Sequence, residues 1–230
     1  MDLRDVTAIV VPAGTERLKR DLARDESAAA LKRFVEQGGV VVAIRGGAEA
    51  LREKGAGLSA VKAWEPPKEA RDEKGEAKGA AAGKAKEATE RGKEKPADGE
   101  DADLVKDLDR RPLSLPGAAL KARTSLPNHP LLFGLGGRVP EFLVSDGRPP
   151  KRLPEAASNV VSVVEENPLA AGFAWREAIE RWAGAPLVQV EEIGKGSVVS
   201  FAADPVFRGT WPGSAILFLN AVLAGSGLTN

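Results

Sequence analysis

The sequence predicts an α/β domain with a parallel sheet, because two apolar runs are each followed by a helical pattern. Residues 7–11 (TAIVV) are a short β-branched run, and apolar side chains then recur at helical spacing over residues 16–37. A second apolar run, Val40–Ile44, leads through a sharp glycine turn into the helix-like AEAL of residues 48–51. Strand, helix, strand and helix over about fifty residues indicate a βαβ unit, whose strands are parallel.

Turn and cap residues bound these first elements. The first strand ends at Pro-Ala-Gly, residues 12–14, as expected of a buried parallel strand and its turn. Residues 25–27 divide the helical pattern into two pieces, with Ser27 as a candidate cap of the second piece. The glycines at 38–39 end the second piece at its carboxyl terminus.

Short strands and helices are also expected in the second half of the chain. The turn Gly194-Lys195-Gly196 joins two of the strands so closely that they must form an antiparallel hairpin. The last helix is strongly apolar and is followed by Gly225. The strands are expected at residues 142–144, 159–165, 187–191 and 197–202, and the helices at 173–182 and 214–223.

Residues 66–103 differ from the rest of the chain. They contain no Val, Ile, Leu, Phe or Trp, and their basic and acidic residues are intermixed. Such a segment cannot bury enough apolar surface to offset the entropy of ordering it. We therefore predict one domain over residues 1–230 with a disordered, charged insertion at 66–103; a docking tail is the alternative interpretation of this segment.

Composition excludes several classes of function. The formal net charge is zero, and no segment combines clustered basic residues with aromatics, so we expect no nucleic-acid partner. The chain has no cysteine, which excludes thiolate metal sites and cysteine nucleophiles within it. Its single histidine, His129, cannot build a histidine-rich zinc site. We expect no metal ligands, no cofactor and no catalytic residues.

The sequence shows no apolar run long enough to cross a membrane, so no membrane partner is expected. The beginning, MDLRDVTAIVV, lacks the basic region and long apolar region of a signal peptide. The compartment stays open: cytoplasmic if the chain is complete, and extracytoplasmic if it is part of an exported protein.

Candidate binding residues follow the predicted strands. Arg45, with Gly46 and Gly47, can present a guanidinium and backbone N–H groups to a carboxylate or phosphate; the alternative is a tight turn whose arginine pairs with a local acid. Asp204 and Arg208 follow a later strand, either as a binding pair or as a structural ion pair. Since the carboxyl ends of parallel strands share one edge, we expect any ligand site to lie there.

His129 lies in Asn-His-Pro, residues 128–130. A capping or loop-stabilising hydrogen bond and a ligand contact are the two interpretations. The sequence places no obvious catalytic partner beside it, because no other histidine and no cysteine exist in the chain.

Three phrases carry a family resemblance: LKRFVEQGGVVVAIRGG, NHPLLFGLGG and IGKGSVVSFAADPVFRGTWPGSAILFLNAVL. Together they resemble the class I glutamine-amidotransferase-like domain, in the version found at the carboxyl end of some bacterial zinc carboxypeptidases of the carboxypeptidase A type. The resemblance implies a flavodoxin-like three-layer sandwich with a mainly parallel sheet, to which the antiparallel carboxyl-terminal hairpin is added. It also implies an accessory role beside a peptidase.

The chain departs from the family pattern at the positions that carry chemistry. An active amidotransferase has a cysteine in the elbow, activated by a histidine and a carboxylate. Aligning Gly47 with the glycine that closes the elbow puts Arg45 at the position of that cysteine, and arginine is no nucleophile. A carboxypeptidase zinc site needs two histidines and a glutamate, which one histidine cannot supply.

The resemblance also implies that strand-helix units of the full fold precede residue 5, so the chain is expected to be a fragment or an abbreviated relative. Its exposed sheet edge would then be covered by a partner or by a second copy in a homodimer. We predict a non-catalytic, amidotransferase-like accessory domain that binds a ligand or a protein such as a peptidase. The alternatives are a hydrolase with unusual machinery using Ser or Asp side chains, and a purely structural scaffold.

Overall fold

The computed structural model describes most of the chain outside residues 63–114. The described residues all belong to one compact unit. They are residues 3, 5–14, 16–52, 56–62, 115–145 and 148–224. The insertion expected at residues 66–103 lies outside them, so its disorder and the assignment of residues 1–230 to a single domain stay predictions.

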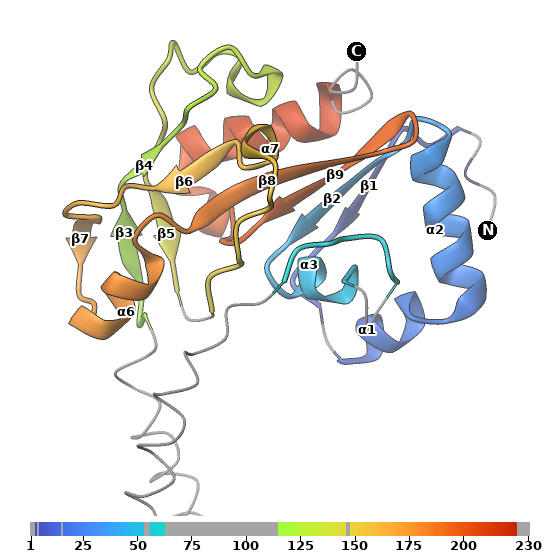
Figure 1. Cartoon of the computed structure of the whole chain (residues 1–230), viewed down its shortest axis with the longest axis horizontal. Helices are drawn as coiled ribbons and strands as arrows, with labels where there is room; N and C mark the ends of the chain where they lie inside the picture. The colour runs from blue at the N-terminus through green and yellow to red at the C-terminus, as the bar shows by residue number, and fades with distance from the viewer. Residues whose placement is uncertain are drawn as a thin grey trace, which may run out of the picture. The chain divides into compact units, whose positions relative to one another are not determined.

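The main sheet is mixed, with parallel strands on one side and antiparallel strands on the other (Figure 1). Its described strands are β1 (Ala8–Val11), β2 (Val40–Ile44), β4 (Ala122–Arg123), β6 (Val161–Val163), β8 (Pro186–Ile193) and β9 (Gly196–Phe201). They lie in the order β1-β2-β9-β8-β6-β4. β1, β2 and β9 are parallel, and Val42 pairs with Val10 on one side and with Val199 on the other.

The prediction of a mainly parallel sheet is wrong. Among the described strands, β9 to β8, β8 to β6 and β6 to β4 are antiparallel pairs. A parallel neighbour requires a long crossover connection, whereas β8 and β9 are joined by a tight turn. The carboxyl-terminal hairpin itself is confirmed, with Val188 opposite Phe201 and Ile193 opposite Gly196.

Three strands in the second half of the chain form a second, small sheet. It contains β3 (Ala118–Leu120), β5 (Phe142–Val144) and β7 (Leu169–Gly172), in the order β5-β3-β7 with antiparallel pairing. The strand predicted at 142–144 is therefore confirmed, but it lies in a sheet that the sequence did not indicate. The strand predicted at 159–165 is present as β6, but it is shorter than predicted and covers only Val161–Val163.

The predicted helices are confirmed with small changes at their ends. The α-helices are α1 (Glu16–Leu22), α2 (Asp25–Glu36), α3 (Gly46–Ala50), α6 (Arg176–Trp182) and α7 (Pro212–Ala224), and the short 3-10 helices are η2 (Pro130–Leu132), η3 (Ala156–Ser158) and η4 (Phe207–Gly209). Ser27 does not cap α2, because the helix already begins at Asp25 and its N-cap is Arg24. Asp25 and Glu26 lie in the first turn of α2, where their negative charge interacts favourably with the positive end of the helix dipole.

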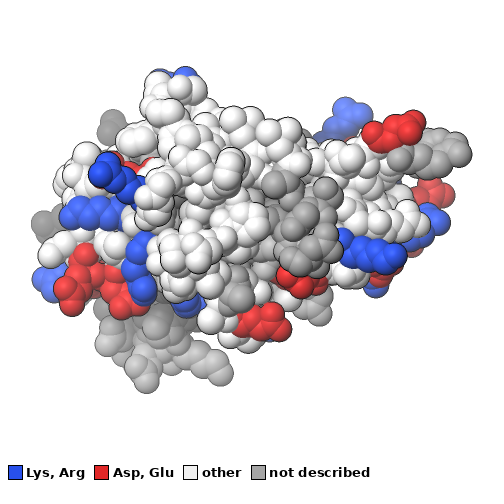
Figure 2. Space-filling view, turned by 90° about the horizontal axis from the view of Figure 1, so that it is seen from above, with Lys and Arg blue, Asp and Glu red and all other residues white. Residues whose placement is uncertain are grey.

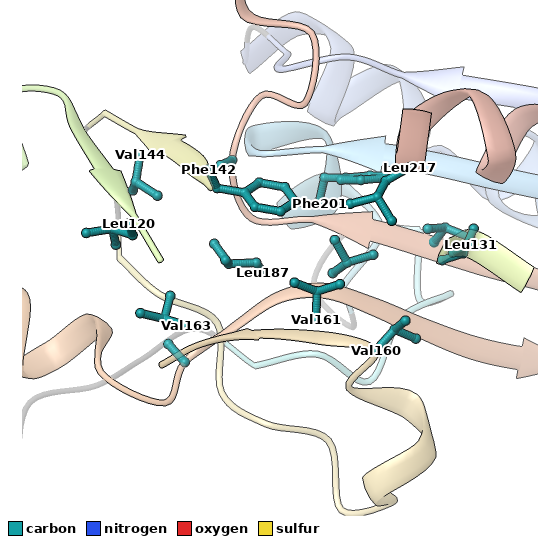
Figure 3. Packing of buried hydrophobic residues seen from close by; sticks show 14 of the residues in the cluster. Leu120, Leu131, Phe142, Val144, Val160, Val161, Val163, Leu187, Phe201 and Leu217 are labelled. Carbon is teal, nitrogen blue, oxygen red and sulfur yellow. The ribbon is translucent and has the colours of Figure 1, made fainter. Parts of the chain in front are cut away.

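Apolar side chains cover both faces of the main sheet. On one face Val40, Val42 and Val199 pack with Leu217 and Ala221 of α7. Figure 3 shows this cluster converging from both sheets and from α7. On the other face the buried residues come from β1, β2, β9, α2, α3 and the segment after α3. They are Val11, Leu31, Phe34, Val35, Val41, Ala43, Ala48, Leu51, Ala56, Leu58 and Val198. Helices therefore lie on both sides of the sheet, which confirms a layered α/β arrangement.

β1 is the edge strand of the main sheet among the described strands. Its Val10 side chain is 40% exposed, although Val11 beside it is buried. An edge strand presents unpaired backbone groups to whatever adjoins it. The expected additional strand-helix units and the expected partner at this edge stay predictions.

Candidate functional site

The turn after β2 has a strained backbone. All five residues of β2 are buried, and Arg45 follows directly with φ 49° and ψ −116°. This conformation is rare for a residue with a side chain and costs of order 1–3 kcal/mol. The Arg45 amide donates a 2.8 Å hydrogen bond to the carbonyl oxygen of Phe201, the last residue of β9. The predicted sharp turn is therefore present, and it lies at the carboxyl ends of two parallel strands.

Gly47 allows the end of β1 to pass close to this turn. A Cβ atom placed on Gly47 would collide with the carbonyl oxygens of Val11 and Pro12. A Cβ atom on Gly46 would instead lie 3.6 Å from its nearest neighbour, the Gly14 nitrogen, which is ordinary contact. Of these two candidate residues, Gly47 is required by packing and Gly46 is not.

The Arg45 side chain reaches a distant part of the chain. Its Nη2 donates a 2.9 Å hydrogen bond to the carbonyl oxygen of Ser145, which directly follows β5. Among the described residues the guanidinium is therefore paired with a carbonyl oxygen, and no carboxylate forms an ion pair with it. Arg45 thus joins the two sheets while it retains N–H donors for a ligand.

A cavity of about 120 Å³ opens beside the turn. Its lining includes Arg45 and Gly46 after β2, and Phe201 and Ala202 at the end of β9, so it lies at the edge where a ligand was expected. The cavity also contains side chains that were not singled out from the sequence. The polar ones among them are Glu49, Arg52, Arg148, Gln189 and Ser200.

The floor of the cavity carries buried polar groups from β8 and β9. Gln189 and Ser200 are paired across the hairpin and are 1% and 4% exposed. The Gln189 amide nitrogen donates to the Lys151 carbonyl at 3.1 Å and to Asn159 Oδ1 at 2.9 Å. The Ser200 hydroxyl has no hydrogen-bond partner among the described residues. The signal for both residues was present in the sequence, because each interrupts an apolar strand (LVQVE and SVVSFA).

Arg52 is a partly buried arginine in the same cavity. Its Nε atom is buried without a hydrogen-bond partner among the described residues. Burial lowers the pKa of Arg52 from its usual value, and the negative charge of Glu49 opposes that shift. The carboxylate of Glu49 also lies 3.5 Å from the Lys19 ammonium, so Arg52 shares this acid with another cation.

Asp204 and Arg208 lie outside the cavity lining. Asp204 Oδ1 accepts a 3.0 Å hydrogen bond from the Val206 amide, and the Arg208 guanidinium lies 5.2 Å from the centre of the Phe207 ring. Both side chains are described, and no ion pair joins them. Arg208 is exposed and has a positive φ of 50°. The structure thus does not bring this pair together with Arg45 in one cavity.

His129 acts as a cap. Its Nδ1 accepts a 3.2 Å hydrogen bond from the Leu131 amide at the start of η2. Burial lowers the pKa of His129, which agrees with a neutral imidazole that accepts a hydrogen bond from the backbone. The capping interpretation is confirmed, and His129 is not part of the cavity lining.

The described residues contain no group of three or more His, Cys, Asp or Glu side chains arranged to hold a metal ion. Within the same residues, no helix is both long and apolar enough to span a membrane.

No family model and no curated protein matches the chain. Among solved structures it is similar to the cytoplasmic protein STM3548 from Salmonella typhimurium, with a TM-score of 0.50 and 11% identity over 96% of this chain and 72% of that chain. It is also similar to part of the beta-galactosidase from Bacillus circulans sp. alkalophilus, with a TM-score of 0.47 and 13% identity over 100% of this chain and 24% of that chain. At this identity, the similarity to STM3548 shows the fold alone: the chain has a class I glutamine amidotransferase-like fold.

Proposed function

We propose that the chain is a non-catalytic, amidotransferase-like domain that binds a ligand in the cavity beside Arg45. The observation that carries this proposal is the place of Arg45. It occupies a strained strand-to-helix turn, the kind of turn that presents a nucleophile in enzymes, yet its side chain is a guanidinium that lines a cavity. A strained backbone conformation persists only where the surrounding structure enforces it, and such conformations cluster at functional sites. We infer that this turn serves to position the Arg45 side chain.

The chemistry of the cavity favours binding over catalysis. The chain has no cysteine, and its one histidine, His129, caps η2 and does not line the cavity. Ser200 lines the cavity, but no base among the described residues forms a hydrogen bond with its hydroxyl. A serine without a base is a weak nucleophile. The alternative of a hydrolase with unusual machinery therefore has little support from these residues.

The accessory role belongs to the same proposal. The closing segment, residues 193–223, resembles the domain that follows bacterial zinc carboxypeptidases, so we propose a peptidase as the protein that this domain accompanies. The cavity beside Arg45 would then serve recognition, and the peptidase would supply the chemistry.

Thermal unfolding with a ligand panel tests the proposal. The full chain is heated alone and with short peptides, cell-wall fragments, sugar acids and nucleotides, and a ligand at a hundred times its Kd should add about 2.7 kcal/mol of stability. Arg45→Ala should abolish the effect. Arg24→Ala is the matched control, because Arg24 pairs with Asp21 in α1, away from the cavity lining. Stabilisation that survives Arg45→Ala, or turnover in glutaminase or peptidase assays, would contradict the proposal.

A second candidate function is self-association, favoured by an apolar surface on and beside α7. Phe133, Leu219 and Leu223 are 81%, 52% and 79% exposed, and the Asn220 amide of α7 donates to the Phe133 carbonyl at 2.8 Å. Residues 209–230 contain no charged side chain. Figure 2 shows uncharged residues over the middle of the face seen from above, with charged residues gathered toward its ends. α7 also packs on the edge strand β1, so a second copy could cover both.

Sedimentation of the full chain tests this second candidate. We expect a concentration-dependent dimer that Leu223→Glu converts into a monomer. Gln37→Glu adds the same charge at an exposed position after α2 and should leave the dimer intact. A monomer at every concentration would rule self-association out.

A further inference from the structure

We infer that the ligand of the cavity beside Arg45 is a small organic acid, whose carboxylate is held by Arg52, Arg148 and the Ser200 hydroxyl. This inference rests on the proposed function and names the chemical class of the ligand. Carboxylate and phosphate share the oxygen acceptors that arginine recognises, so the test includes both.

The cavity has an excess of positive charge. Among the described residues, three arginines line it, Arg45, Arg52 and Arg148, against the single carboxylate of Glu49. That carboxylate lies 3.5 Å from Lys19, so part of its charge is already balanced outside the cavity. The arginines are not held in ion pairs with any described carboxylate. An anion in the cavity would supply the missing counter-charge.

Two residues that line the cavity each have a buried polar atom without a partner among the described residues. Arg52 Nε and Ser200 Oγ are both buried, and neither has a hydrogen-bond partner among the described residues. Ser200 as a whole is 96% buried, since its relative exposure is 4%. Buried polar groups in folded proteins are almost always hydrogen-bonded, so an unpaired one calls for a missing partner. A carboxylate has two acceptor oxygens, enough to receive one bond from each atom.

The directions of the pKa shifts of Arg52 and Arg181 agree with this inference. The pKa of Arg52 is lowered by burial, a cost that a nearby anion would offset. The pKa of Arg181 in α6 is lowered by burial and by the positive charge of Arg148. The positive charges of Arg148 and Arg181 therefore repel each other. A bound carboxylate beside Arg148 would relieve this repulsion.

The size of the cavity limits the ligand. A volume of about 120 Å³ is well below that of sites for drug-sized ligands, which span roughly 300–1,000 Å³. It suits a small acid or the carboxylate end of a longer molecule, rather than a whole nucleotide.

Another arginine-rich hollow lacks these features. A groove of about 320 Å³ on the α1 region is lined by Arg17, Arg20, Asp21 and Arg24. Asp21 lies 3.0 Å from Arg24 and 3.8 Å from Arg17, and all three side chains are substantially exposed. No unpartnered buried polar atom of the described residues lines this groove. Arg24 therefore provides a control for arginine charge without a built site.

Calorimetric titration of the full chain tests the inference. Acetate, succinate and glutarate are compared with their neutral amides and with inorganic phosphate. We expect at least one acid to bind and its amide not to bind. Arg148→Gln should weaken acid binding about tenfold or more, as expected for a lost charge-assisted hydrogen bond, and Ser200→Ala by several-fold. Arg24→Gln removes the same charge and should leave the affinity unchanged.

The other outcomes separate this inference from the proposed function. If none of the acids bound but a neutral ligand bound in an Arg45-dependent way, the assignment of an acid would be wrong, whereas the proposed binding function would stand. Phosphate binding more tightly than every acid would also overturn the assignment. Equal losses in Arg148→Gln and Arg24→Gln would show general charge attraction rather than a site. Arg148 is exposed, so Arg148→Gln should fold even if Arg52→Gln does not.

Discussion

Arg45 and Phe201 are joined by a 2.8 Å hydrogen bond from the amide of the first to the carbonyl of the second. The bond continues the parallel pairing of β2 with β9 by one residue and fixes the turn at the carboxyl ends of both strands. Arg45, Ser200 and Phe201 all line the cavity beside this turn.

Arg45→Gly should be more stable than Arg45→Ala. Both substitutions remove the guanidinium and its bond to Ser145, but only glycine adopts φ 49° without strain. The relief is partly offset because glycine gains more entropy in the unfolded chain. We expect a net difference of about 1 kcal/mol in the free energy of unfolding, measured by denaturant titration. Equal stabilities would show that the turn relaxes in solution.

Gly47→Ala should destabilise the fold strongly, and Gly46→Ala should not. The added methyl group at Gly47 meets the backbone oxygens of Val11 and Pro12, which cannot move without shifting β1. We expect a loss of about 3 kcal/mol in the free energy of unfolding. The adjacent Gly46 has room for the methyl group and is the matched control. A mild effect at Gly47 would mean that β1 approaches the turn less closely.

Lowering the pH below 6.5 should destabilise the chain through His129. The folded state lowers the pKa of this imidazole, so below the unfolded value the unfolded state binds more protons. This contribution is fully present above pH 6.5 and is lost as the pH falls toward the folded pKa. His129→Asn keeps an acceptor for the Leu131 amide and cannot titrate, so its stability should depend less on pH in this range. An unchanged pH profile would remove His129 as the cause.

Asn159→Ala should weaken both the fold and the cavity floor. Asn159 is 3% exposed; its Oδ1 accepts from the Leu153 amide and from Gln189, and its Nδ2 donates to the carbonyls of Leu153 and Glu155. Leaving buried partners unpaired costs about 1–3 kcal/mol for each group. We expect a loss of about 3 kcal/mol in the free energy of unfolding, together with weaker ligand binding because Gln189 loses a support.

Asn128→Ala is the control for this substitution, because Asn128 is exposed. It should change the free energy of unfolding by less than about 0.5 kcal/mol. If Asn159→Ala were equally mild, the hydrogen bonds of Asn159 would not contribute to stability in solution.

Local pattern was enough to predict the elements that form over short distances. The strand Val40–Ile44 with its turn, and the hairpin of β8 and β9, depend on β-branched runs and glycine placement within a few residues. The division between α1 and α2 was predicted for the same reason, because it lies within one helical pattern.

The pairing of strands and most of the cavity depend on contacts that sequence periodicity does not carry. β2 lies beside β9, and Arg45 bonds to Ser145, 100 residues later. Arg148 lines the cavity although it follows a different sheet, and no local motif marks it. Asp204 and Arg208 show the reverse case: they follow a strand as binding residues often do, but the backbone takes them away from the cavity lining.

The most direct test of the account is an amide-proton NMR titration of the full chain with the tightest-binding small acid. The account predicts chemical-shift changes concentrated at residues 45–48 and 200–202, which surround the cavity, and their loss in Arg148→Gln but not in Arg24→Gln. Shifts centred instead on Arg17, Arg20 and Arg24, or spread evenly over the surface, would contradict a binding site beside Arg45.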